Sequence, residues 1–457
     1  MSSPTDGLGV DTTRRVVIVG ASLAGHTAAA ELRRLGFDGS LTLVGDEMHL
    51  PYDRAPLSKG VLTGAIEPDS TRLVEAEDVE ADWLLGVAAV RLDRERRLVV
   101  LADGRQLPYD RVLVATGRRA RSWPTTHEAA FDNVVTIRRR EDAHGLRGRL
   151  RSVREVLVLG AGFIGSEVAS SCRELGLDVT IVDRADAPLE SALGQPLSTA
   201  AAALQRRHGV DLRMRTSITR MIPGNGDDDR RVRQVQLDDG SVVDVDLVVV
   251  AIGSVPNTEW LAGAGLAVDP RYGLACDGTL RAVTDKAMPD DAVYAAGDVV
   301  QVPHPVYDNQ LIAVEHWGTA VDHGRIAAHN MISGPGGRQT VTALPRFWSN
   351  QFGVNIKSVG LPTAADHLVV AQGSVESERG VLLYGRAGVT VAAVSLNAPR
   401  ELEPYVTLIT SRSPFPPDLN LPDRVPSGPP PPVPVRFARS DDSTPASKSA
   451  WGRTPTR

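Results

Sequence analysis

The sequence predicts an α/β protein made of two copies of one doubly wound fold, followed by a small α+β domain. Two stretches carry this prediction: apolar residues at 16–19 lead into a turn at Gly20, and apolar residues at 156–159 lead into a turn at Gly160. In both, a buried strand turns sharply into a helix of small residues. The length of 457 residues, 42% of them apolar, is enough for about three domains with substantial cores.

The first turn has the features of a dinucleotide cradle. Gly20 permits a tight turn, and Ser22 stands where a second glycine is usual. Ala24 and Gly25 let the following helix pack closely against the strand. Such a turn places a pyrophosphate at a helix N-terminus, and Asp46 ends the next strand as an acid for a ribose hydroxyl. One match of this kind also fits an ordinary strand, turn and helix.

The second turn repeats the pattern with all three glycines, Gly160, Gly162 and Gly165, and its second strand ends at Asp183. At nearly equal distances after each cradle come an Asp-Gly hairpin and a strand that ends in glycine. Agreement at three successive points indicates an internal duplication. A protein with two such cradles most simply binds two dinucleotides and passes electrons between them.

The remaining segments divide the chain into domains. Segments 87–93, 97–102 and 106–115 alternate like antiparallel strands on a half-exposed sheet. A strand at 291–296 has no partner left in the second copy, so it returns the chain to the first. Five short β-rich stretches after residue 334, at 347–352, 354–359, 367–371, 380–384 and 389–396, predict the α+β domain together with a helical segment near 401–410. The expected domains are 14–121 with 255–332, 122–254 and 333–426, and the Pro- and Ser-rich segment 427–457 is expected to be disordered.

Composition excludes several classes of function. A net charge of −6 gives no general case for nucleic acid binding, and no apolar run is long enough to span a membrane. The two cysteines, Cys172 and Cys276, are too far apart in sequence to suggest a disulfide framework or a metal cluster. The first 13 residues lack the pattern of a signal peptide. We therefore expect a cytoplasmic protein.

An arginine-rich segment at 138–154 has two interpretations, which the sequence leaves open. It is either the solvated face of a helix or a docking patch for an acidic partner, because dispersed surface arginines steer association even on a net acidic protein.

Together, these residues give the chain, from about residue 14 to residue 426, a resemblance to the FAD-dependent, NADH-utilising ferredoxin reductases of oxygenase systems. This is the putidaredoxin reductase and dioxygenase ferredoxin reductase family. The resemblance implies an α/β fold with two homologous Rossmann-like dinucleotide-binding domains, as in glutathione reductase, and a small α+β C-terminal domain. Its specific marks are segments 43–47, 51–54, 56–59, 115–117, 162–167, 296–298 and 347–351.

The resemblance implies that the first copy binds FAD and the second binds NADH. The FAD residues would be Gly20, Ser22, Ala24, Gly25, Asp46, Lys59, Ala89, Thr116, Gly117, Arg138, Asp298 and Trp317. The NADH residues would be Gly160, Gly162, Ile164, Gly165, Glu167, Asp183 and Gly253.

The resemblance also assigns roles within these sets. Lys59 would stand beside the isoalloxazine and pair with Glu167, and these two would be the catalytic residues. The carboxylate of Asp183 would repel a 2′-phosphate, so NADH should be preferred over NADPH. Arg184 next to it could instead accommodate that phosphate, and this leaves the strictness of the preference open.

The implied reaction passes electrons from NADH through FAD to a [2Fe-2S] ferredoxin, which supplies a cytochrome P450 or a Rieske-type aromatic-ring dioxygenase. Disulfide reductases of similar fold need a cysteine pair after the first cradle, and this stretch has no cysteine. Two alternatives remain: a reductase of rubredoxin or of a small quinone-like acceptor, and an NADH-sensing flavoprotein resembling apoptosis-inducing factor.

Overall fold

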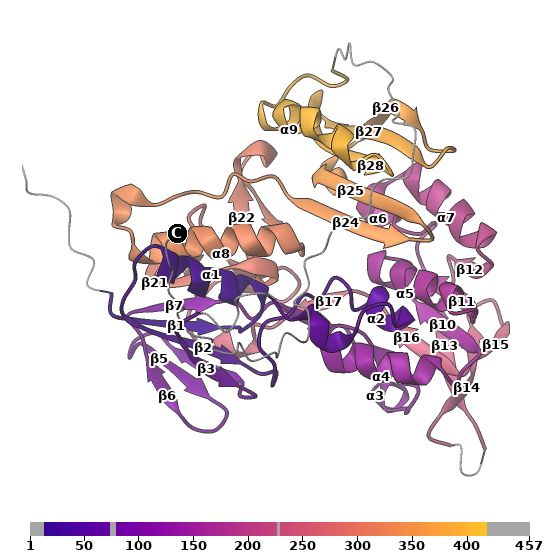
Figure 1. The fold of residues 1–457 in the computed structure, drawn as a ribbon, viewed down its shortest axis with the longest axis horizontal. Helices are drawn as coiled ribbons and strands as arrows, with labels where there is room; N and C mark the ends of the chain where they lie inside the picture. Colours follow the sequence, from indigo (N-terminus) through magenta and orange to yellow (C-terminus); the bar gives the residue numbers. More distant parts are fainter. Residues whose placement is uncertain (1–12, 74–78, 226–228, 418–457) are drawn as a thin grey trace, which may run out of the picture.

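The first large sheet is parallel except for its antiparallel edge strand, β20, and is formed by segments from both ends of the predicted first domain. The computed structural model describes residues 13–73, 79–225 and 229–417, so segment 427–457 lies outside the described residues. The sheet has the order β20-β21-β7-β1-β2-β3 (Figure 1). Its strands are β1 (Arg15–Val19), β2 (Ser40–Gly45), β3 (Asp82–Leu85), β7 (Arg111–Val114), β20 (Arg281–Val283) and β21 (Pro289–Ala295).

The chain returns to this first sheet after building the second copy. β21 pairs in parallel with β7, and β1 pairs in parallel with both β2 and β7. The central strands are apolar on both faces because helices cover them, as in other doubly wound sheets. Helices α1 (Leu23–Arg34) and α8 (Trp317–Ile332) pack against each other beside this sheet.

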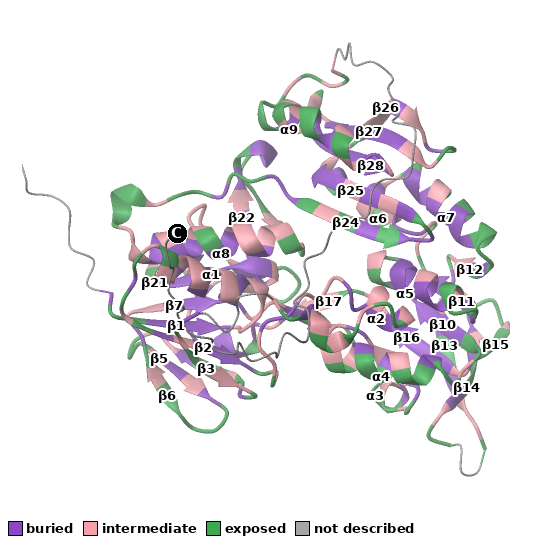
Figure 2. Cartoon of the chain, viewed as in Figure 1, coloured by how far each residue is buried: buried purple, intermediate pink, exposed green. Residues whose placement is uncertain are grey.

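The second sheet repeats the first, with five parallel strands in the order β12-β11-β10-β16-β9. Buried residues gather in the central strands of both parallel sheets (Figure 2). The strands are β9 (Val134–Thr136), β10 (Glu155–Leu159), β11 (Asp178–Asp183), β12 (Val210–Met214) and β16 (Leu247–Val250). The helices are α3 (Thr126–Ala129), α4 (Arg140–Leu150), α5 (Phe163–Glu174), α6 (Glu190–Leu193) and α7 (Leu197–Arg207).

Each copy also carries a three-stranded antiparallel sheet, which lies in the chain between β3 and β7 in the first copy and between β12 and β16 in the second. In the first copy these are β4 (Ala89–Asp93), β5 (Leu98–Leu101) and β6 (Gln106–Pro108); in the second they are β13 (Ile218–Pro223), β14 (Val232–Leu237) and β15 (Val242–Asp244). The prediction of one antiparallel strand over 106–115 was wrong. Strand β6 ends at Pro108, and β7 turns away to run parallel between β1 and β21.

Two antiparallel strands connect the two copies, and we call this pair the crossed ribbon. The chain leaves the first copy through β8 (Arg118–Ala120) and returns to it through β17 (Ser254–Pro256). The returning chain then forms a four-stranded sheet in the order β18-β19-β22-β23. Its strands are β18 (Val268–Asp269), β19 (Gly273–Ala275), β22 (Val300–His304) and β23 (Gln310–Ala313).

The C-terminal unit is an antiparallel sheet in the order β24-β25-β28-β27-β26 with one helix, α9 (Glu403–Thr410), against it. It lies beside the second copy, where β24 contacts α5 (Figure 1). The five β-rich stretches expected from the sequence are all strands here. They are β24 (Arg346–Gln351), β25 (Val354–Gly360), β26 (His367–Ser374), β27 (Arg379–Arg386) and β28 (Val389–Leu396).

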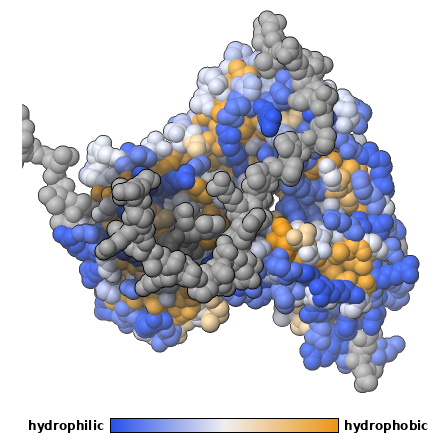
Figure 3. Space-filling view, in the orientation of Figure 1, coloured by the Kyte–Doolittle hydropathy of each residue, from blue (hydrophilic) through white to orange (hydrophobic). Residues whose placement is uncertain are grey.

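The outer surface is largely polar, with hydrophilic residues over much of the visible face and apolar residues in smaller patches (Figure 3). Among the described residues, every helix is too short or too polar to cross a bilayer.

His323 is a titratable residue on the buried side of α8. It is 4% exposed, and its Nδ1 has no hydrogen-bond partner in the part of the chain that the structure describes. Burial lowers its pKa from 6.5 to about 4, and the charge of nearby His304 acts in the same direction. The folded protein therefore holds this imidazole neutral at pH values where the unfolded chain protonates it.

We predict that His323 makes the protein less stable as the pH falls from 6.5 towards 4. The unfolded state binds more protons than the folded state in this window, so the free energy of unfolding drops by about 2 kcal/mol between pH 6.5 and 5. Urea unfolding at several pH values measures the free energy of unfolding at each pH. A plot of this free energy against pH should have a shallower slope in His323→Gln than in the wild type. An unchanged slope would show that another group carries the dependence.

Candidate functional site

The two glycine turns have the same strained geometry at the ends of β1 and β10. Gly20 has φ of +120°, and a Cβ there would lie 2.0 Å from the carbonyl oxygen of Ala115. Gly160 has φ of +106°, and its Cβ would lie 2.4 Å from the carbonyl oxygen of Ala251. Glycine is required at both positions because a side chain would strike the backbone of the neighbouring strand.

Each turn leads to a helix N-terminus that is free to bind an anion. Ser22 and Gly162 are the N-caps of α1 and α5; neither makes a side-chain capping bond, and neither first turn contains an acid. The positive ends of the helix dipoles thus point to the carboxyl edges of the sheets. Ser22 replaces the usual glycine without strain, since its backbone is extended, with φ of −114°.

The other predicted glycines fall into two groups, those with open space around them and those packed against the backbone. A Cβ at Gly117, Gly162 or Gly253 would meet no atom within 4 Å among the described residues. Gly25 and Gly165 are instead packed tightly, each with its Cβ position 1.9 Å from the carbonyl oxygen of the first glycine in its turn. The donor set and the open cradles therefore fit two dinucleotides, one in each copy.

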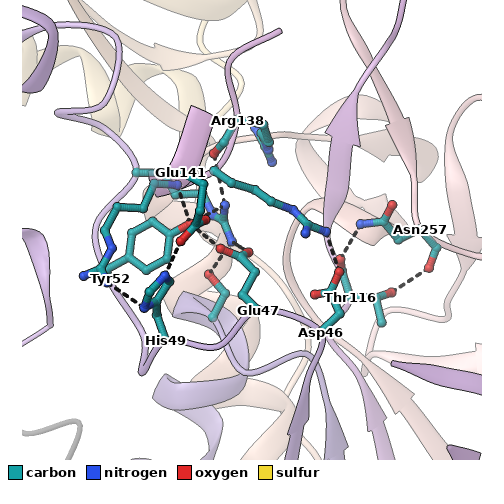
Figure 4. Close-up of polar contacts among 12 residues, drawn as sticks. Asp46, Glu47, His49, Tyr52, Thr116, Arg138, Glu141 and Asn257 are labelled. Carbon is teal, nitrogen blue, oxygen red and sulfur yellow. Dashed lines mark hydrogen bonds and ion pairs between the residues drawn. The ribbon is translucent and has the colours of Figure 1, made fainter. Parts of the chain in front are cut away.

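Arg54 brings a positive charge to the first cradle, and the analysis of the sequence did not single it out. Its Nη2 lies 3.5 Å from Ser22 Oγ and 2.6 Å from Glu47 Oε1 (Figure 4). Its Nη1 donates to the hydroxyl of Tyr52 at 3.0 Å. Burial opposes the charge, but Tyr52 and Glu47 hold the pKa of Arg54 above its usual value. The sequence did contain one signal that could have identified Arg54, because it lies in segment 51–54, which is one of the specific marks of the family.

The predicted FAD residues Asp46, Arg138 and Asp298 lie in ion pairs between the two copies. Arg138 Nη2 is 2.8 Å from Asp298 Oδ2. Arg139 pairs with Asp46, whose carboxylate is labelled in Figure 4. The two arginines directly precede α4 of the second copy, whereas the two carboxylates belong to the first. Arg139 is therefore a second residue that the sequence did not single out.

The arginine-rich segment ties the two copies together, a role that neither sequence interpretation anticipated. Besides Arg138 and Arg139, Arg140 binds Asp69 and Arg147 binds Glu67, and all four carboxylates belong to the first copy. Charges engaged in this way contribute less to an external docking patch than free guanidinium groups would.

The remaining predicted FAD residues lie at the connection between the copies, at the start of β4 and at the start of α8. Thr116 Oγ1 donates to the carbonyl oxygen of Asn257, and Asn257 Nδ2 donates to the carbonyl oxygen of Thr116, so the two connections between the copies are bonded to each other (Figure 4). Ala89 begins β4 and is partly exposed. Trp317 begins α8, is 42% exposed and lies edge-to-face with Trp348 at a ring separation of 6.1 Å.

Lys59 and Glu167 meet at the boundary between the copies. Lys59 Nζ lies 2.7 Å from Glu167 Oε2 and donates to the carbonyl oxygen of Ala55 at 3.0 Å. Lys59 is the N-cap of α2 (Gly60–Thr63), and Glu167 lies in the second turn of α5 with only 3% exposure. The structure thus brings together the two residues expected to be catalytic.

Asp183 lies at the second cradle, at the end of β11. Its Oδ2 accepts the N–H of Ala161 at 2.6 Å, and its Oδ1 accepts the N–H of Ala185 at 2.8 Å. Ile164, at the start of α5, is 42% exposed and presents an apolar surface beside this turn. The carboxylate is therefore held at the glycine turn, and each oxygen keeps a lone pair for a ligand.

A family model for pyridine nucleotide-disulphide oxidoreductases matches residues 14–324, and a model for the reductase C-terminal domain matches residues 346–425. The chain belongs to the pyridine nucleotide-disulphide oxidoreductase family. This oxidoreductase is 35% identical to the rhodocoxin reductase of Rhodococcus erythropolis, over 88% of this chain and 91% of that one. It is 33% identical to the putidaredoxin reductase of Pseudomonas putida, over 90% and 95%.

The fold of this oxidoreductase matches that of the reductase in the covalent putidaredoxin reductase-putidaredoxin complex. The TM-score is 0.81 at 31% identity, over 88% of this chain and 94% of that chain. The match confirms two predictions: the fold of two Rossmann-like domains with an α+β domain, and membership of an oxidoreductase family that uses a pyridine nucleotide. Several relatives are named as ferredoxin reductases.

This oxidoreductase differs from the disulfide-reducing members in its cysteines. Cys172 and Cys276 are free and buried. Burial raises the pKa of the Cys172 thiol to about 12 and that of Cys276 still further. Thiols of this kind are poor nucleophiles, so the two cysteines are not suited to disulfide exchange.

We predict that Arg54→Met weakens FAD binding roughly tenfold, because the cradle loses its charge-assisted hydrogen-bond donor. Titration of the apoprotein with FAD, followed by fluorescence, measures the affinity. Arg91→Met is the matched control, because Arg91 lies on β4 and pairs only with nearby Asp93 among the contacts described. Equal FAD affinity in the two variants would remove Arg54 from the site.

Proposed function

We propose that this oxidoreductase takes electrons from NADH, passes them through FAD to a [2Fe-2S] ferredoxin, and so supplies a cytochrome P450 or an aromatic-ring dioxygenase. The observation that carries the proposal is the Lys59–Glu167 pair, which lies between two dinucleotide cradles. Its relatives support the choice of acceptor, because they include the reductase components of the p-cumate and anthranilate dioxygenase systems, at 34% identity each. We also propose the cytoplasm as its compartment, which its two free cysteines support.

A bound flavin would supply the redox chemistry, because its ring can exchange electrons in pairs and singly. The chain's own residues would bind and orient the cofactors. The N-termini of helices α1 and α5 would each hold a pyrophosphate. In the Lys59–Glu167 pair the carboxylate is buried, the ammonium is partly exposed, and the carbonyl oxygen of Ala55 holds the ammonium in place, so the pair would present a fixed polar surface at the boundary between the copies.

The preference for NADH rests on Asp183. Its carboxylate accepts ribose hydroxyls but repels a 2′-phosphate, and its hydrogen bonds from Ala161 and Ala185 prevent it from turning away. Arg184 is exposed, and its guanidinium makes no contact with the cradle among the described residues. We therefore propose that the carboxylate, rather than the arginine, decides the preference.

Stopped-flow mixing of the flavin-loaded protein with NADH tests the proposed reaction directly. We expect rapid bleaching of the flavin absorbance, followed by ferredoxin-dependent reduction of cytochrome c. Slow reoxidation with altered oligomerisation, and no transfer to any ferredoxin, would instead support an NADH sensor.

We predict that Asp183→Asn lowers the ratio of the NADH rate to the NADPH rate roughly tenfold, because the amide keeps one hydrogen-bond acceptor but loses the charge that repels a phosphate. Flavin reduction by each cofactor measures the ratio. Asp186→Asn changes an exposed acid three residues along the chain and should leave the ratio as in the wild type. The same ratio in Asp183→Asn would contradict the assignment.

We predict that Lys59→Met slows flavin reduction by NADH by roughly one to two orders of magnitude. The buried carboxylate of Glu167 then lacks its cation, and the two side chains no longer hold a fixed position between the cradles. Single-turnover stopped flow isolates this step from electron delivery. Lys286→Met, at an exposed turn, is the control. A wild-type rate in Lys59→Met would show that the pair has no part in the step.

A further inference from the structure

Glu167 is the residue at which all three units of the chain meet. Ser58 donates to its Oε2 at 2.5 Å, and Lys59 pairs with the same oxygen, both from the first copy. Ser349, on β24 of the C-terminal unit, donates to Oε1 at 2.6 Å. A carboxylate that is 3% exposed needs such partners, because a buried charge without them is strongly unfavourable.

Contacts on both oxygens fix the plane of this carboxylate. The last torsion of a glutamate side chain is broad, so partners on one oxygen leave the group free to rotate. Ser58 and Lys59 hold Oε2, and Ser349 holds Oε1 from the opposite unit. Among the contacts described for Glu167, Ser349 is the one that reaches Oε1, so the orientation of the carboxylate depends on it.

The Ser349 hydroxyl is itself held in place. Gln351 Nε2 donates to Ser349 Oγ at 3.3 Å, which leaves the hydroxyl hydrogen for Glu167. Ser349 is 1% exposed and Gln351 is 2% exposed. At the end of the strand, the N–H of Phe352 donates to Ser170 Oγ at 2.7 Å, so the chain after β24 is fixed to the helix that carries Glu167.

We propose that Ser349 is a positioning residue for the Lys59–Glu167 pair, and that the C-terminal unit in this way completes the site between the two cradles. Ser349 acts through Glu167 and not on either cofactor. The inference rests on the proposed transfer of hydride from NADH to FAD.

The first experiment compares two serine-to-alanine variants of the flavin-loaded protein in stopped-flow reduction by NADH. Ser358 is the matched control: it lies on β25 opposite Phe347, is 2% exposed, and its Oγ has no hydrogen-bond partner among the described residues. We expect Ser349→Ala to lower the rate about tenfold and Ser358→Ala to leave it near the wild-type value. Ser349→Thr, which keeps the hydroxyl, should recover most of the loss.

The second experiment repeats Ser349→Ala in a Glu167→Gln background. If Ser349 acts through the carboxylate, its removal should cause little further loss once that carboxylate is gone. The same tenfold loss in both backgrounds would overturn the proposal, because the serine would then act independently of Glu167.

A third measurement does not depend on activity. Amide hydrogen exchange in β24 and α5 should be the same in Ser349→Ala as in the wild type, since a positioning role leaves the elements folded. Faster exchange across both elements, with no recovery of the rate in Ser349→Thr, would assign the serine to packing and overturn the proposal. If NADH fails to reduce the wild-type flavin, the proposed function itself fails; if it succeeds and Ser349→Ala is equally fast, only this inference fails.

Discussion

The burial of the Glu167 carboxylate is the constraint on which the arrangement of the three units depends. A carboxylate can leave water only if hydrogen-bond donors surround it, and no single unit of this chain supplies enough of them. Ser58 and Lys59 donate from the segment that begins α2 in the first copy, Ser349 donates from β24 of the C-terminal unit, and Glu167 itself belongs to the second copy. The three units must therefore dock together to satisfy one side chain. The boundary between the two cradles is therefore defined by polar chemistry and not by apolar packing alone.

The duplication explains why that boundary lies where it does. Each copy presents its helix N-terminus and its glycine turn at the carboxyl edge of its parallel sheet. The crossed ribbon of β8 and β17 fixes the two edges relative to each other, and the mutual hydrogen bonds of Thr116 and Asn257 hold the two connections in register. Two cofactors bound at these edges would approach each other at the Lys59–Glu167 pair.

Local patterns in the sequence predicted most of the fold, because strands, glycine turns and the repeat depend on residues close together in the chain. The five C-terminal strands and the paired turns at Gly20 and Gly160 are of this kind. The strand expected over 106–115 failed because alternation continues across Pro108, although the pairing partner changes there. Periodicity describes which residues are buried, but it does not identify the neighbouring strand.

The site could be predicted only as far as family motifs extend. They pointed to Lys59 and Glu167, but not to Ser349 as the donor on the second oxygen, because that contact joins residues 182 positions apart. Likewise, the charge of the arginine-rich segment at 138–154 was evident from the sequence, whereas its partners on the first copy were not. Contacts between units depend on how the units dock, and that information is spread over the whole chain.

The ion pair between Arg139 and Asp46 still allows Asp46 to accept a hydrogen bond from a ribose hydroxyl, as expected from the sequence. An ionised carboxylate offers about four lone-pair sites, and one arginine occupies at most two of them. Asp46 can therefore accept a ribose hydroxyl while it keeps its ion pair with the second copy. The same reasoning applies to Asp298 and Arg138. The residues expected to hold the flavin thus also hold the two copies together, so that loss of either carboxylate would weaken the cofactor site and the docking of the units at once.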